Sequence, residues 1–236
     1  IAATKGRAKI SQEYTMYSPA GVLLFAAGQP LEVDLDTQIL LGGPGASDGT
    51  VNPDSFSQLY ATLAIYQGQS YSVVSAIPTI DQESLRAAGQ DYPESLKEHY
   101  TTLPETLPLR VRELANEIAG DSATPYDAAK KLEQYLRAIP YNELISGPNP
   151  GEDGVDYFLF REQQGYCDYY ASSMAVMLRS LGIPSRIAQG YSQGKQITQG
   201  EYEVRQTNGT RAVQLVGQFG RQGFLKYLRE RIHGGQ

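Results

Sequence analysis

The spacing of the apolar residues changes once along this 236-residue chain, near Tyr92. Before Tyr92, short apolar stretches are separated by Gly, Pro, Asn and Asp, and in Leu31–Leu35 they alternate with acidic residues, the pattern of a half-buried strand. After Tyr92, apolar residues recur every three or four positions, as along one face of a helix. The sequence therefore predicts a small β-sandwich-like domain over residues 1–80 and a separate domain after it.

Three helices are predicted after this change. The first ends near Gly120, and its apolar face consists of Leu107, Val111, Leu114 and Ile118. The second begins with Thr124 as a side-chain cap and Pro125 at the first helical position. The third has Cys167 in its first turn and ends at Gly182, a residue type that is common just past a helix C-terminus.

Cys167 is the only cysteine in the chain, and it falls in the first turn of its helix. Free backbone amides and the positive end of the helix dipole stabilise a thiolate at such a position, and the thiolate is the nucleophilic form. The neighbouring Asp168 has the opposite effect, because its negative charge disfavours a second one. A lone cysteine can equally be a small buried apolar residue, so position alone leaves both interpretations open.

The composition limits the classes of partner. Twenty basic against 26 acidic residues give a net charge of −6, which repels nucleic acid, and one cysteine with two histidines leaves too few ligands for a metal, so no cofactor is expected. Residues 209–236 hold five basic residues and one acidic, a net of +4, whereas residues 1–208 carry −10. The sequence begins at Ile1 without a leader-like segment, so we expect a processed chain or a piece of a longer protein.

A longer pattern surrounds Cys167. It comprises Gly165-Tyr166-Cys167, the helix ending Leu178-Arg179-Ser180-Leu181-Gly182-Ile183-Pro184, then Arg186 and Gly190-Tyr191, with Pro140-Tyr141 and Asp156-Tyr157-Phe158-Leu159 before it and Glu201-Tyr202-Glu203-Val204-Arg205 after it. With these residues the chain resembles the transglutaminase-like superfamily, most closely the bacterial branch that is built into membrane proteins. The likeness extends over residues 70 to 208.

The resemblance implies a papain-like α+β fold for residues 81–208, in which the cysteine helix packs on an antiparallel sheet. It also implies acyl transfer with Cys167 as the nucleophile: the thiolate attacks an amide, and water or an amine resolves the thioester. The expected substrate is a protein, a peptide or a cell-wall amide. Members of this branch lie outside the cytoplasm between membrane-spanning segments, so an extracytoplasmic location and flanking membrane segments are expected here.

The likeness stops at the strand that should supply the base. Where the family has an Asp/Asn-Ala-His-Ala-Trp-Val-Glu segment, this chain has Asn208-Gly209-Thr210-Arg211-Ala212-Val213-Gln214, with Thr210 in place of His and Ala212 in place of Trp. The two histidines are His99, expected on the surface, and His233, near the C-terminus. We therefore expect Cys167 to be the only catalytic residue retained, with no histidine nitrogen or carboxylate within hydrogen-bonding reach of its sulfur.

Three hypotheses account for this atypical basic tail over residues 209–236. The sequence after Asn208 is a changed reading frame, or the chain is a non-catalytic module that keeps the fold to bind peptide or cell-wall material, or another chain supplies the base. The first explains the charge reversal together with the loss of His, Trp and acid. Under the enzyme hypothesis Cys167 is accessible and reactive near neutral pH, whereas a binding module allows a buried, inert thiol.

Overall fold

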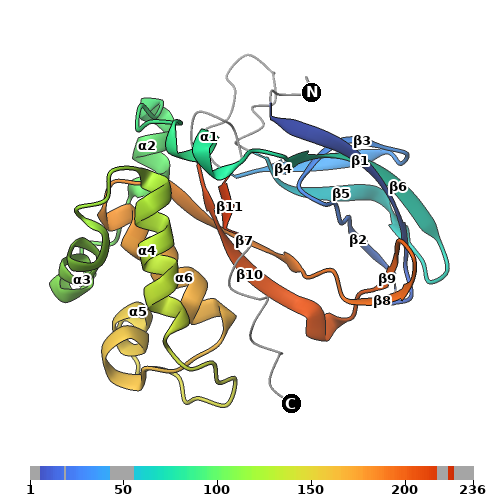
Figure 1. The fold of residues 1–236 in the computed structure, drawn as a ribbon. Coiled ribbons are helices and arrows are strands. Elements are labelled where there is room, and N and C mark those ends of the chain that lie inside the picture. The colour runs from blue at the N-terminus through green and yellow to red at the C-terminus, as the bar shows by residue number, and fades with distance from the viewer. Residues whose placement is uncertain (1–5, 19, 43–55, 217–222, 226–236) are drawn as a thin grey trace. The chain divides into compact units, whose positions relative to one another are not determined.

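The structure is a computed structural model that describes residues 6–18, 20–42, 56–216 and 223–225 (Figure 1). The chain forms two compact units, one over Ile1–Ser84 and one that starts at Leu85. Each unit has its own buried core. No helix among the described residues is long and apolar enough to cross a membrane.

The N-terminal unit consists of two antiparallel sheets of three strands. One sheet has the order β1-β6-β3 and the other β2-β5-β4. The strands are β1 (Arg7–Thr15), β2 (Gly21–Leu23), β3 (Gln29–Val33), β4 (Thr37–Leu41), β5 (Phe56–Ile65) and β6 (Ser70–Pro78). The core of this unit consists of Leu24, Leu59, Ala61, Ile65, Tyr71 and Val73. Both sheets contribute to one core, which confirms the β-sandwich-like domain.

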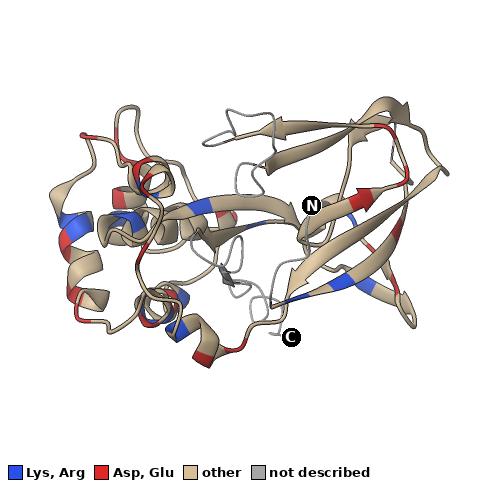
Figure 2. Ribbon diagram, turned by 90° about the horizontal axis from the view of Figure 1, so that it is seen from above, with Lys and Arg blue, Asp and Glu red and all other residues tan. Residues whose placement is uncertain are grey.

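The second unit begins with helices and ends with strands. The helices are α1 (Gln82–Arg86, at the junction of the units), α2 (Glu94–Thr101), α3 (Leu109–Ala119), α4 (Pro125–Arg137), α5 (Gly154–Asp156), the π-helix η2 (Tyr157–Glu162) and α6 (Cys167–Ser180). The strands that follow are β7 (Ser185–Tyr191), β8 (Lys195–Thr198), β9 (Glu201–Glu203), β10 (Gly209–Leu215) and β11 (Gly223–Leu225), with the short 3-10 helix η3 (Gln206–Asn208) before β10. Figure 2 shows acidic and basic residues interspersed over the helices.

The helix ends follow the sequence signals. The Thr124 hydroxyl accepts the Asp127 backbone N–H at 3.1 Å, which caps α4 as predicted. Gly182 has a φ of 73°, and the amide of Ile183 donates to the Leu178 carbonyl at 3.0 Å. This is the Schellman arrangement, which only a residue tolerant of positive φ closes cheaply, so Gly182 ends α6 as predicted.

The cysteine helix packs on an antiparallel sheet. Strands β11, β10 and β7 form this sheet, in which Thr210 lies opposite Gly190 and Val213 opposite Ile187. Helix α6 contacts β7 and β10 on one side and α3 and α4 on others. Its fully buried residues include Ala171, Met177 and Leu178, which share one core with Val213. The predicted papain-like α+β core is therefore confirmed.

Candidate active site

Cys167 is the first residue of α6. Gly165, two residues before it, forms backbone hydrogen bonds with the segment around Tyr141. The Gly165 amide donates to the Pro140 carbonyl at 3.2 Å, and the Asn142 amide donates to the Gly165 carbonyl at 2.8 Å. A Cβ on Gly165 would meet the Phe158 ring at 3.0 Å. A side chain at position 165 would therefore crowd the Phe158 ring, so glycine suits this position, where Gly165 forms a short parallel bridge with Tyr141 beside the start of the cysteine helix.

The Cys167 thiol is partly exposed and has a carboxylate within reach. Its Sγ donates to Asp168 Oδ1 at 3.4 Å, and the same oxygen pairs with Arg211 Nε at 3.0 Å. The prediction that no carboxylate lies near the sulfur is therefore wrong. Arg211 projects from β10 toward the start of α6, so it pairs with the Asp168 carboxylate beside the thiol rather than leaving it in water.

The surroundings keep this thiol protonated. Burial raises the pKa of Cys167 most, and the hydrogen bond and negative charge of Asp168 raise it further. A backbone hydrogen bond from Arg211 and its positive charge lower the pKa, but the net shift is upward. The stabilisation of a thiolate expected from the helix start is thus outweighed by desolvation and by Asp168.

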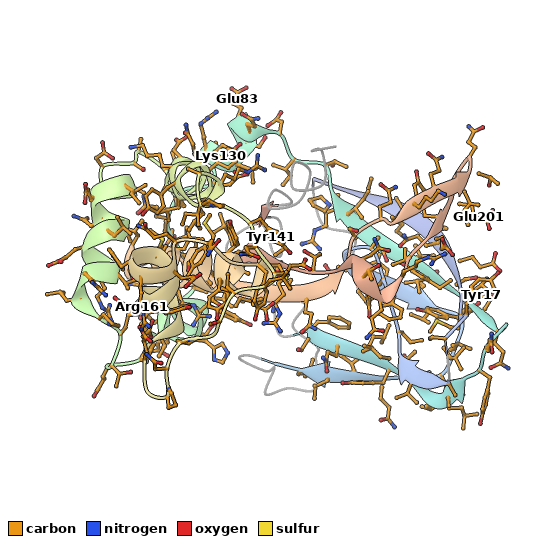
Figure 3. The ribbon with its side chains drawn as sticks, turned by 90° about the horizontal axis from the view of Figure 1, so that it is seen from below. Tyr17, Glu83, Lys130, Tyr141, Arg161 and Glu201 are labelled. Carbon is orange, nitrogen blue, oxygen red and sulfur yellow. The ribbon has the colours of Figure 1, made fainter. Side chains whose placement is uncertain are left out.

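Tyr141, labelled in Figure 3, also lies next to Cys167, because its hydroxyl interacts with the Cys167 backbone amide. Its hydroxyl donates to Glu143 Oε1 at 2.9 Å. Burial raises the pKa of Tyr141 most, the hydrogen bond and charge of Glu143 and the charge of Cys167 raise it further, and a backbone hydrogen bond from Cys167 lowers it. The hydroxyl therefore stays neutral next to the amide at the start of α6. No role for this hydroxyl follows from the sequence, although Tyr141 belongs to the Pro140-Tyr141 motif.

Neither predicted histidine meets the thiol among the described residues. His99 is exposed on α2, and its ring packs edge-on against Tyr100 at 4.6 Å between centroids. The Tyr100 hydroxyl accepts from Arg186 at 3.3 Å, near the end of α6 opposite to Cys167. A helix of 14 residues is about 20 Å long, which separates His99 from the sulfur. His233 lies outside the described residues.

Strand β10 presents Arg211, not Thr210, to the cysteine helix. Arg211 pairs with Asp168, and Val213 belongs to the core around α6. Side chains alternate along a strand, so Thr210 and Ala212 face the other side of the sheet. Within the predicted tail, residues 209–215 form an ordinary antiparallel strand. Residues 217–222 and 226–236 of the tail lie outside the described residues.

A sequence model of the Transglutaminase-like superfamily matches residues 112–217. The chain carries a transglutaminase-like domain. The matched region runs from α3 to the residue after β10 and contains Tyr141, Cys167 and Arg211.

Two curated relatives and one solved structure agree with this assignment. The uncharacterized protein YebA of Bacillus subtilis is 35% identical over 164 residues, 66% of this chain and 22% of that protein. A protein-glutamine gamma-glutamyltransferase of Pseudomonas aeruginosa is 39% identical over 93 residues, 39% of this chain and 14% of that protein. The chain thus spans less than a quarter of either relative.

The periplasmic domain of TgpA from Pseudomonas aeruginosa, solved with bound ethylmercury, is similar over 94% of this chain and 72% of its own. The two share 27% sequence identity with a TM-score of 0.66. This transglutaminase-like domain has no cluster of three or more His, Cys, Asp or Glu side chains suited to a metal ion among its described residues.

Proposed function

We propose that the transglutaminase-like domain is a cysteine acyl-transfer site with Cys167 as the nucleophile. The observation that carries the proposal is the partly exposed thiol at the first residue of α6, flanked by the backbone amides of Cys167 and Arg211. The substrate class is the side-chain amide of glutamine or a peptide-type amide, as the name of the Pseudomonas relative suggests. We extend the same proposal to the substrates and partners of the whole protein.

The proposed reaction proceeds through a thioester. The Cys167 thiolate attacks the carbonyl carbon, a C–S bond forms, and the backbone amide at the helix start stabilises the negative oxygen. The C–N bond breaks as the leaving nitrogen takes up a proton, which releases ammonia or an amine. An acceptor amine or water then attacks the thioester, the C–S bond breaks, and the thiolate is regenerated.

We further propose that this site is catalytically incomplete as it stands. The attack needs a base for the thiol proton, and the described residues bring no imidazole to Cys167. Asp168 accepts the S–H, but its charge is paired with Arg211 and it raises the pKa of the thiol that it would have to deprotonate. The same observation favours the second candidate, a non-catalytic module that binds peptide or cell-wall material.

The proposed location is outside the cytoplasm, next to membrane segments of a longer protein. The support is the likeness to a periplasmic domain over nearly the whole chain. The short share of each curated relative that the chain spans fits a domain within a larger protein.

The test restores an imidazole at two adjacent positions of β10. Arg211→His puts it on the face of the strand that meets Cys167, and Thr210→His is the matched control on the other face. Iodoacetamide alkylation of Cys167 is followed by mass spectrometry between pH 5 and 11. Incorporation of a fluorescent amine into a glutamine peptide is measured in parallel, with Cys167→Ala as the blank.

We expect the natural chain to alkylate slowly at pH 7 and to incorporate no amine, and Arg211→His to gain both properties while Thr210→His gains neither. If the natural chain already alkylates rapidly at pH 7, the proposed incompleteness is wrong. If neither histidine variant gains reactivity, the acyl-transfer proposal fails and the binding module is favoured.

A further inference from the structure

The segment that carries Tyr141 is tied to the residues just before Cys167 by a chain of side-chain hydrogen bonds. Asn142 Nδ2 donates to Gln164 Oε1 at 3.1 Å, and Gln164 Nε2 donates to Glu162 Oε1 at 2.7 Å. The other oxygen of Glu162 accepts from the Tyr157 hydroxyl at 2.8 Å. We call these four residues, Asn142, Tyr157, Glu162 and Gln164, the brace.

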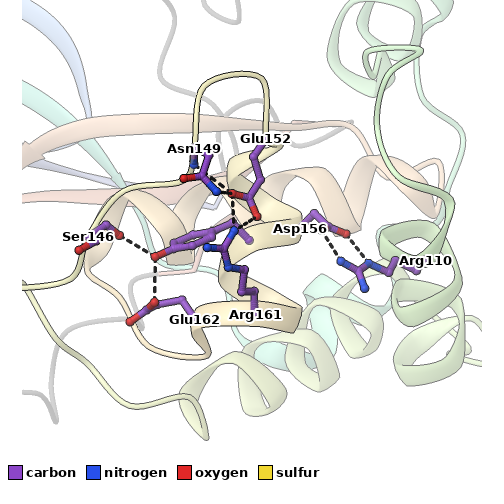
Figure 4. A network of polar contacts seen from close by, with 8 residues as sticks. Arg110, Ser146, Asn149, Glu152, Asp156, Arg161 and Glu162 are labelled. Atoms are coloured by element: carbon purple, nitrogen blue, oxygen red, sulfur yellow. Dashed lines mark hydrogen bonds and ion pairs between the residues drawn. The ribbon is translucent and has the colours of Figure 1, made fainter.

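The brace is anchored at both ends. The Tyr157 hydroxyl also lies 2.7 Å from the Ser146 carbonyl, and Tyr157 is 2% exposed, so the anchor is part of the core (Figure 4). At the other end, the Asn142 amide donates to the Gly165 carbonyl, two residues before Cys167. The loop from Tyr141 to Ser146 is thus fixed at one end to Gly165, just before the cysteine helix, and at the other end to Tyr157 of η2.

Glu162 is the centre of the brace and stays ionised. The hydrogen bond from Gln164 lowers its pKa most and that from Tyr157 lowers it further, against a smaller effect of burial. A carboxylate that accepts two hydrogen bonds forms stronger bonds than a neutral acceptor does. Its charge therefore tightens both contacts at neutral pH.

The backbone at this point is strained in a way that the brace explains. Glu162 ends a π-helix, and Gln163 follows it with a φ of 51°, the only positive φ outside glycine among the described residues. Such strain persists only where the surroundings determine the conformation, and π-helical turns are frequent at functional sites. Here the hydrogen bonds of the two neighbours, Glu162 and Gln164, hold the turn.

We propose that Glu162 and Gln164 are positioning residues, which hold the Tyr141 hydroxyl at the start of the cysteine helix. The inference rests on the proposed function, because it treats this hydroxyl as a wall of the acyl-binding position. Neither residue contacts the sulfur in the structure. Both act through Asn142 and through the backbone bridge to Gly165.

The test exchanges the carboxylate and the amide. Gln164→Glu alone puts two carboxylates where a 2.7 Å hydrogen bond existed, so it breaks the brace. The double variant Glu162→Gln with Gln164→Glu rebuilds it, because the new amide at 162 donates to the new carboxylate at 164, which still accepts from Asn142. Glu152→Gln is the matched control: Glu152 accepts from Asn149 and Arg161 in the same region but has no bond to the brace.

The first readout is backbone amide hydrogen exchange of residues 140–146, measured in variants that keep the natural Arg211. Hydrogen exchange does not depend on turnover. We expect exchange at least ten times faster in Gln164→Glu, and rates within about twofold of the natural chain in the double variant and in Glu152→Gln. Unchanged exchange in Gln164→Glu, or no rescue in the double variant, overturns the inference.

The second readout is amine incorporation in the Arg211→His background, normalised to alkylatable Cys167. We expect Gln164→Glu to lower kcat about tenfold with little change in KM, and the double variant to restore it. Full turnover in Gln164→Glu overturns the positioning role. If Arg211→His itself has no turnover, the proposed function has failed, and hydrogen exchange alone decides whether the brace exists.

Discussion

The two flanks of Cys167 are built in different ways. On the flank formed by residues 140–146, backbone and side chains are joined to the start of α6 by hydrogen bonds that include the brace. On the β10 flank, one residue supplies the polar contacts: Arg211 forms a partly exposed ion pair with Asp168 and a backbone hydrogen bond to Cys167. The first flank depends on residues next to the cysteine helix, whereas the second depends on which side chain a separate strand presents. The shape of the site is therefore independent of the group that would supply the base.

The largest expected effect comes from removing the apolar support of the first flank. Phe158 is fully buried, lies under Gly165 and packs on Tyr170 at 5.0 Å between ring centroids. We expect Phe158→Ala to lower the free energy of unfolding by about 4 kcal/mol, as a large cavity in a core does. The counterpart on the β10 flank is Val213→Ala, with an expected loss of roughly 2 kcal/mol.

Urea denaturation measures both changes, and Phe160→Ala is the control, because that ring is only partly buried. Equal losses for Phe158→Ala and Val213→Ala would contradict the expectation that the larger cavity under Gly165 is the more destabilising.

A smaller loss is expected from a helix cap that lies away from both flanks. Thr124→Ala removes the acceptor of the Asp127 amide at the start of α4, so we expect a loss of about 1 kcal/mol. The pH profile of Cys167 alkylation should stay that of the natural chain. A shifted profile would show that the site responds to general destabilisation, and the flank comparison would lose its basis.

The smallest effect on stability, with a clear effect on chemistry, is expected from the ion pair. Asp168 raises the pKa of Cys167 and Arg211 lowers it, so Asp168→Asn should lower the thiol pKa and Arg211→Gln should raise it. Alkylation by iodoacetamide at pH 7.5 should become faster in the first variant and slower in the second. Both side chains are about one-third exposed, so each change in stability should stay below about 1 kcal/mol.

The same ion pair also affects stability in alkali. A thiol whose pKa is raised by folding stabilises the folded state below the pKa of the unfolded thiol, and this contribution is lost as the pH rises through the folded pKa. Asp168→Asn should therefore show a smaller loss of stability between pH 8 and pH 10 than the natural chain. A larger loss would mean that Asp168 does not raise the thiol pKa.

Elements specified by local signals could be predicted from the sequence. Thr124 before Pro125 marked the start of α4, and Gly182 marked the end of α6, because caps depend on one or two residues. The alternation in Leu31–Leu35 identified β3, which the structure has at Gln29–Val33. The cysteine at the helix start followed from the same kind of pattern.

Features that depend on distant partners could not be predicted. The position of Tyr141 beside Cys167 is set by a bridge between segments more than 20 residues apart. The pairing of Asp168 with Arg211 beside the sulfur joins the cysteine helix to the separate strand β10. The π-helical form of the aromatic run Tyr157–Glu162 has no local signal in the sequence.

The bridge between Tyr141 and Gly165 closes a long loop, and the length of this loop can change at little cost in free energy. The entropy lost on closing a loop grows slowly, by about 0.6 kcal/mol for each doubling of its length. Gly147 is exposed and lies between the hydrogen-bonded Ser146 and Asn149. Extra residues inserted there would lengthen the loop while leaving the brace and the thiol in register, so this point can accept an insertion without rebuilding the start of the cysteine helix.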